Sequence, residues 1–101
     1  MMKDEILHFI AQFASAKDCF LHGCCYWFAV ILKYRFSRQA SCTIMYHVID
    51  NHFATLIEGA LYDASGEIAQ DGFMDWDDVP DYDCLEYERI IRDCVLMEER
   101  E

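Results

Sequence analysis

Proline, glycine and positive charge are all scarce in this chain. Its 101 residues include 1 Pro and 4 Gly, which excludes collagen-like and flexible-linker sequences. Hydrophobic residues make up 54% and aromatic residues 15%, so the chain can form a core and is not wholly disordered. This length predicts one domain, residues 1–101.

Long apolar runs and a basic N-terminal segment are also lacking. The longest apolar run, residues 24–32, is well short of the roughly 20 residues that a membrane-spanning helix needs. Asp4 and Glu5 stand where a secretory signal would carry basic residues. The sequence therefore predicts a cytoplasmic protein with no signal peptide and no membrane association.

Negative charge dominates and is concentrated near the C-terminus. The chain has 8 Lys and Arg against 19 Asp and Glu, a net charge of -11 at pH 7. Residues 71–101 hold 12 of these acids and only 3 Arg. Because such a surface repels phosphates, nucleic acid is not expected as a direct ligand.

Six cysteines are many for this length. A secreted disulfide scaffold is one interpretation, but the missing signal and the ample apolar content favour reduced thiols. Four potential zinc ligands lie close together in the sequence: Cys19, His22, Cys24 and Cys25. The usual distant second ligand pair is not evident, and Cys84 or Cys94 would have to complete the site. We therefore expect no metal and no cofactor.

The apolar pattern predicts an α+β fold. Residues 3–15 have helical periodicity, and residues 24–36 are apolar on every side until Lys33, which predicts a central helix buried all round. Residues 42–48, 52–57 and 61–64 predict an antiparallel meander of at least three strands. An acidic loop, 69–83, and a C-terminal helix, about 82–97, follow. The expected fold is an N-terminal helix and a buried central helix packed on a small antiparallel sheet, with a C-terminal helix.

Three residues in this layout form a candidate catalytic set: Cys25 opens the central helix, His52 opens a strand, and Asp63 lies on the next strand. A free thiol with a pKa near 8.5 is only about 3% ionised at neutral pH. A helix N-terminus lowers that pKa by less than about one unit. A histidine that takes the proton, oriented by an acid, would supply the rest.

Strand register tests whether Asp63 can reach His52. If the hairpin turns on residues 58–59, position 57 pairs with 60 and position 54 pairs with 63. His52 and Asp63 then share one face as diagonal neighbours, about 7–8 Å apart between backbones. An odd-length loop would place Asp63 on the opposite face.

Three segments together resemble small papain-like or transglutaminase-like proteins: Gly23-Cys24-Cys25-Tyr26-Trp27-Phe28-Ala29, His52-Phe53-Ala54 and Leu61-Tyr62-Asp63-Ala64-Ser65-Gly66. The resemblance spans roughly residues 19–66. It implies a minimal papain-like core with Cys25 as nucleophile, His52 as base and Asp63 as orienting acid. The implied activity is a cysteine hydrolase or acyl transferase acting on an amide or ester. Short proteins of this kind also resemble uncharacterised prophage products.

The chain departs from the papain-like pattern at one position. These enzymes carry a Gln a few residues before the Cys, whereas this chain has Asp18-Cys19-Phe20. Structural interpretations also exist for each candidate: Cys25 as a small buried hydrophobe, His52 as a strand-start residue and Asp63 as a turn residue. Cys24 is the alternative nucleophile, and His47 is interpreted as structural.

A second function class follows from the acidic C-terminal third. Its acids are interleaved with aromatic residues that could anchor a partner, namely Phe73, Trp76, Tyr82 and Tyr87. The alternative is a non-enzymatic inhibitor or adaptor of phage type that binds a basic surface of a host protein. A counter-defence factor, such as an anti-CRISPR-like protein, would have this character.

Overall fold

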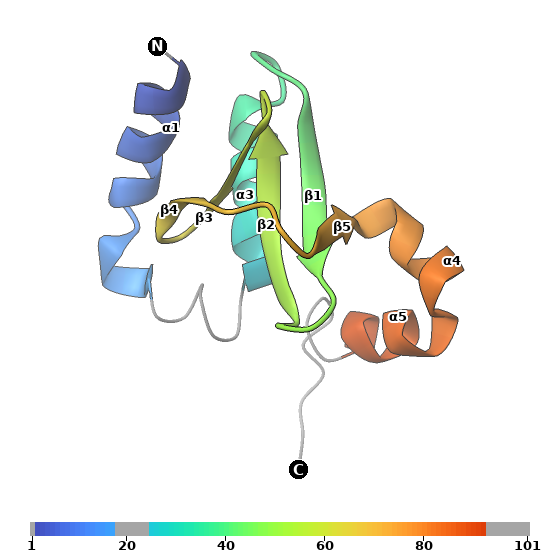
Figure 1. Cartoon of the computed structure of the whole chain (residues 1–101). Coiled ribbons are helices and arrows are strands. Elements are labelled where there is room, and N and C mark those ends of the chain that lie inside the picture. Colours follow the sequence, from blue (N-terminus) through green and yellow to red (C-terminus); the bar gives the residue numbers. More distant parts are fainter. Residues whose placement is uncertain (1, 18–24, 93–101) are drawn as a thin grey trace.

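A computed structural model describes residues 2–17 and 25–92 and confirms the α+β class (Figure 1). Among these residues, helices pack on a five-stranded antiparallel sheet of order β4-β3-β2-β1-β5. The strands are β1 (Cys42–His47), β2 (His52–Ile57), β3 (Ala60–Asp63), β4 (Gly66–Ile68) and β5 (Phe73–Asp75). The helices are α1 (Met2–Ala11), α3 (Cys25–Phe36), α4 (Val79–Tyr82) and α5 (Cys84–Ile90), with 3₁₀ turns η1 (Ala14–Ala16) and η2 (Trp76–Asp78).

The N-terminal helix is shorter than predicted. It ends at Ala11, and the rest of the predicted 3–15 segment forms a turn and η1. Asp4 and Glu5 lie in its first turn, where the helix dipole favours acids. Ile6 and Ile10 are its buried residues and join the core.

The central helix α3 covers one face of the sheet, but it is not buried all round as predicted. Phe28, Leu32 and Phe36 are at most 2% exposed, whereas Trp27 is 41% and Tyr34 is 87% exposed. Among the described residues, the sheet and α1 pack on α3, and Figure 1 shows α3 behind the sheet with α1 to one side. An apolar sequence therefore leaves two large aromatic rings at the surface.

The hairpin between β2 and β3 has the register derived from the sequence. Ile57 pairs with Ala60 and Thr55 with Tyr62. Glu58 and Gly59 both have positive φ, 50° and 81°, which is the two-residue turn that matches strand twist. The even loop length places His52 and Asp63 on the same face of the sheet.

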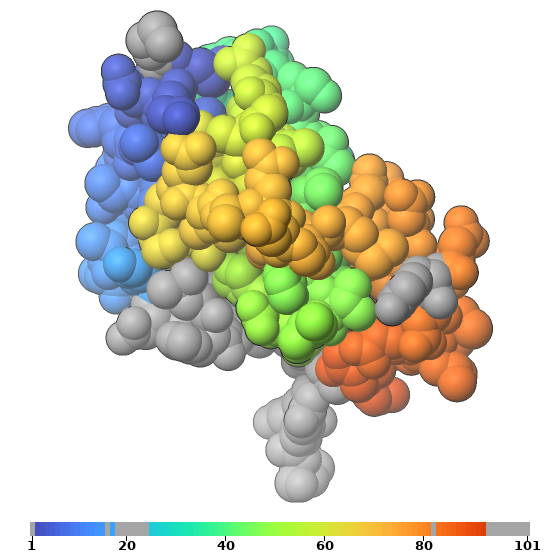
Figure 2. Space-filling view, viewed as in Figure 1, coloured from blue at the N-terminus to red at the C-terminus, as the bar shows by residue number. Residues whose placement is uncertain are grey.

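Two short strands were not predicted. β4 and β5 have three residues each, too few for a clear alternating pattern, and β5 lies within the segment predicted as a loop. Between them, residues 69–72 cross the sheet from one edge to the other, in front of β2 in Figure 1. In Figure 2 the residues of this crossing, in gold, lie at the surface over the sheet.

The core has two parts. One lies between α1, α3 and the sheet, and the other gathers Cys25, Phe53, Trp76 and Ile90 with their neighbours. Trp76 is 8% exposed and stacks on Tyr87 with ring centroids 4.9 Å apart. The second part joins the start of α3 and the start of β2 to the C-terminal elements, and so fixes the position of Cys25.

Candidate active site

His52 and Asp63 are in direct contact. His52 Nε2 lies 2.8 Å from Asp63 Oδ2, and their side chains are 19% and 8% exposed. His52 is the first residue of β2, and Asp63 is the last residue of β3. Their contact follows from the register of the hairpin, because Asp63 lies opposite Ala54 and alternate residues of β2, such as His52 and Ala54, share a face.

Cys25 reaches the same histidine from a different element. It is the first residue of α3 and is 9% exposed. Its thiol lies close enough to the His52 imidazole and to the backbone N–H groups of Phe53 and Tyr26 for all three to influence its pKa. In the register of the hairpin, β3 ends opposite Ala54, so the first two residues of β2 extend beyond β3. The thiol thus contacts β2 where the neighbouring strand has ended.

The ionisation of the site favours a charged pair. Burial alone would raise the pKa of Cys25, but the His52 hydrogen bond, the two backbone N–H groups and the nearby imidazole charge lower it overall. The hydrogen bond to Asp63 and then the one to Cys25 raise the pKa of His52 to about 9. Both shifts move the proton from sulfur to imidazole, which is the state that a thiol nucleophile requires.

Asp63 is held by more than the histidine. Its Oδ1 accepts from the backbone N–H of Ser65 at 2.7 Å and from the Ser65 hydroxyl. Burial acts to raise the pKa of Asp63, but the hydrogen bonds from His52 and Ser65 lower it overall. Asp63 therefore faces His52 as a carboxylate anion.

His47 and Phe73 border the site. His47 pairs with His52 across β1 and β2, and its Nδ1 accepts from the backbone N–H of Asp50 at 3.0 Å. The Phe73 ring lies edge-on to both histidines, with centroid distances of 5.0 Å to His47 and 6.3 Å to His52. Phe73 arrives through the crossing from β4 to β5, which local sequence patterns do not reveal.

Several residues considered from the sequence cannot be placed. The alternative nucleophile Cys24 lies outside the described residues, as do Cys19, His22 and Cys94 of the zinc alternative and the segment Asp18-Cys19-Phe20. In the described part of the chain, no group of three His, Cys, Asp or Glu side chains could hold a metal ion. Cys25, Cys42 and Cys84 are free thiols there. Burial raises the pKa of Cys42, in contrast to that of Cys25.

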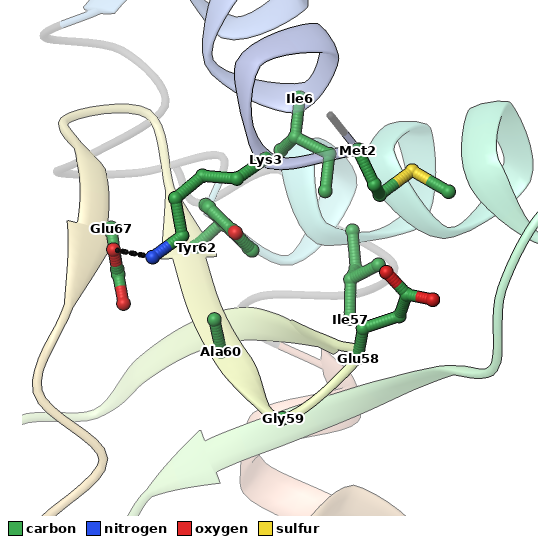
Figure 3. A pocket seen from close by; sticks show the side chains of 9 residues that line it. All are labelled: Met2, Lys3, Ile6, Ile57, Glu58, Gly59, Ala60, Tyr62 and Glu67. Carbon is green, nitrogen blue, oxygen red and sulfur yellow. Dashed lines mark ion pairs between the residues drawn. The ribbon is translucent and has the colours of Figure 1, made fainter.

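A cavity of about 370 Å³ lies at the other end of the β2–β3 hairpin (Figure 3). Lys3 of α1 and Glu67 of β4 form an ion pair of 2.8 Å across it. Its lining residues are Met2, Lys3, Ile6, Ile57, Glu58, Gly59, Ala60, Tyr62 and Glu67. None of the three candidate catalytic residues belongs to this set, because β2 carries His52 at its start and this cavity at its end.

Comparison with known families decides where the chain belongs. A family model described as Phage YunG-like protein matches residues 5–101, which include Cys25, His52 and Asp63. The chain belongs to the phage YunG-like family. No curated protein and no solved structure matches it. This family supports the predicted phage origin.

Among the described residues, no helix has the length and apolar character needed to cross a bilayer.

Proposed function

We propose that this phage YunG-like protein is a minimal papain-like cysteine hydrolase or acyl transferase that acts on an amide or ester. The observation that carries the proposal is the hydrogen bond of His52 to Asp63, 2.8 Å long, together with the interaction of the Cys25 thiol with the same imidazole. The three residues come from a helix start and two strands, in the order nucleophile, base and orienting acid. A buried thiol with a purely structural role has no need of an imidazole backed by a carboxylate.

The geometry supports a specific division of roles. Because His52 Nε2 is bonded to Asp63, Nδ1 is the ring nitrogen left for the Cys25 thiol. The Cys25 thiolate attacks the carbonyl carbon, and the imidazolium of His52 then donates its proton to the departing amine or alcohol. A thioester on Cys25 remains. Water or another acceptor, deprotonated by His52, attacks this thioester and regenerates the thiol.

Stabilisation of the tetrahedral oxyanion would come from the start of α3. The first N–H groups of a helix have no acceptor within the helix, and this end of the helix dipole favours negative charge. Cys25 is the first residue of α3, so its N–H lies beside the reacting sulfur. The chain lacks the Gln of papain-like enzymes, so this backbone donor would carry more of the stabilisation than in those enzymes.

Trapping of the thioester tests the proposal. p-Nitrophenyl acetate is incubated with the full chain, and the acylated residue is mapped by mass spectrometry. We expect the acetyl group on Cys25 and its loss in Cys25→Ser. Cys42→Ser is the matched control and should retain acylation, because the Cys42 thiol donates to the Ala40 carbonyl and burial raises its pKa. Equal acylation of wild type and Cys25→Ser would contradict the proposal.

A second candidate function is a non-enzymatic inhibitor or adaptor that binds a basic host protein. It is favoured by exposed acids on η2, α4, α5 and the adjoining segments, namely Asp71, Asp77, Asp78, Asp81, Asp83 and Glu88. Trp76, one of the anchors expected from the sequence, belongs to the core, and the side chain of Tyr82 lies outside the described part. Leu85, 75% exposed among these acids, is a better placed apolar anchor.

A further inference from the structure

Ser65 donates two hydrogen bonds to Asp63, one more than a simple Asp turn requires. Its backbone N–H and its hydroxyl both donate to Asp63 Oδ1, while His52 Nε2 occupies Oδ2. A bond from the N–H group two residues later is common for Asp in turns. The hydroxyl adds a second donor to the same oxygen, and the Asp63 side chain is only 8% exposed.

The hydrogen bonds donated by Ser65 favour one ionisation state of Asp63 and, through it, one tautomer of His52. The two Ser65 donors point at one oxygen, which favours the carboxylate anion over the protonated acid. An anionic carboxylate only accepts, so His52 must donate to it through Nε2. The neutral imidazole then keeps its lone pair on Nδ1, the nitrogen left to exchange a proton with Cys25.

We propose that Ser65 is a positioning residue that holds Asp63 as an oriented anion and thereby fixes the His52 tautomer that serves Cys25. This role rests on the proposed function of the site and adds a fourth member to it. Ser65 occupies the short turn between β3 and β4, where Asp63 pairs with Gly66. The turn therefore brings the Ser65 hydroxyl back to Asp63, the last residue of β3.

The titratable groups around His52 determine which measurement can report the positioning role of Ser65. α3 contributes Cys25, β1 contributes His47 and β3 contributes Asp63, whereas β5 presents the uncharged Phe73. Because His47 places a second imidazole beside His52, the readout should be the Cys25 thiol itself. The rate of its alkylation reports the thiolate fraction directly.

The experiment measures Cys25 alkylation by iodoacetamide across acid and neutral pH in the full chain, with peptide mass mapping. Ser65→Ala should move the acid limb of the rate profile to higher pH by at most about one unit, since a hydrogen bond to a charged group contributes on that order to Asp63 and reaches Cys25 only through His52. Ser65→Thr keeps a hydroxyl and should restore the wild-type profile. Ser37→Ala, at an exposed serine of a different turn, is the matched control and should also match wild type.

Superimposable profiles for wild type and Ser65→Ala would overturn the role of Ser65 while leaving the proposed function intact. An equal shift in Ser65→Thr would overturn it as well, because the hydroxyl would then not be the cause. A wild-type Cys25 that titrates like an ordinary thiol would instead contradict the proposed function, and this role with it.

A measurement on the wild type alone covers the case in which Ser65→Ala does not fold. The Asp63 carboxyl carbon, followed by NMR, should titrate below the ordinary range of an aspartate. Titration of Asp63 within or above that range would overturn the role of Ser65.

Discussion

Charged groups are buried and paired in the candidate active site but mostly exposed in the acidic C-terminal region. At the site, Cys25, His52 and Asp63 are largely buried, and each interacts with a defined partner. In residues 71–92 most carboxylates are exposed, on the side of the molecule coloured orange to red in Figure 2. Buried, paired groups have shifted protonation, whereas exposed charges are screened by water and salt. The first arrangement suits bond chemistry and the second suits steering of a partner.

Of the substitutions that separate the two regions, loss of the His52 imidazole should have the largest effect, and that effect falls on the candidate active site. His52→Ala removes the group that accepts the Cys25 proton, and general base catalysis contributes on the order of 10²–10⁴-fold in rate. We expect hydrolysis of p-nitrophenyl acetate to fall by about that factor in kcat/KM. His47→Ala is the matched comparison, because it removes an imidazole one strand away. A greater loss in His47→Ala than in His52→Ala would reverse the assignment.

Gly72, where the chain passes from the site region to the acidic region, should accommodate a side chain poorly. It has φ of +86°, and a Cβ there would lie 2.3 Å from Nε2 of His47. We expect Gly72→Ala to destabilise the fold by about 1–3 kcal/mol through overpacking and backbone strain. Thermal unfolding would measure this, with Gly59→Ala as control.

Gly59 also has positive φ but an open space at its Cβ position. Its substitution therefore carries the backbone strain without the contact. A smaller loss of stability in Gly72→Ala than in Gly59→Ala would contradict the packing of the crossing segment against His47.

Neutralising the acidic region should change the site least. Asp77, Asp78 and Asp81 are exposed, and their joint replacement by Asn should alter stability by less than about 0.5 kcal/mol. Asp75 is left intact because its Oδ1 accepts from the Asp77 N–H at 2.9 Å. We expect unchanged acylation of Cys25 in the triple variant. If the protein is instead an acidic adaptor, this variant loses its basic partner in a pull-down while Cys25→Ser keeps it.

The sequence was informative where local rules act alone. A two-residue loop at 58–59 fixes strand parity, so the contact of His52 with Asp63 could be derived before any coordinates. The apolar run after Gly23 predicts a helix over residues 24–36, and among the described residues α3 spans Cys25–Phe36. These features need only neighbouring residues and the geometry of a hairpin.

Features that depend on distant packing could not be derived. The crossing of residues 69–72 brings Phe73 beside His52, and Trp76 enters the core instead of the surface. α3 was expected to be buried all round, but a single sheet covers only one side of a helix. Ser65 belongs to the Asp63-Ala64-Ser65-Gly66 segment, but the return of its hydroxyl to Asp63 depends on the conformation of the turn, which the residue types alone do not determine.

The order in which the six cysteines react with iodoacetamide tests the central claim most directly, namely that His52 holds Cys25 as a thiolate. Brief labelling slightly below neutral pH, followed by mass mapping, favours any thiol of lowered pKa, because ordinary thiols are then about 1% ionised or less. We predict that Cys25 labels first despite its 9% exposure, ahead of the exposed Cys84 and the partly buried Cys42. First labelling of Cys84 or Cys42 with Cys25 left unmodified would contradict the account.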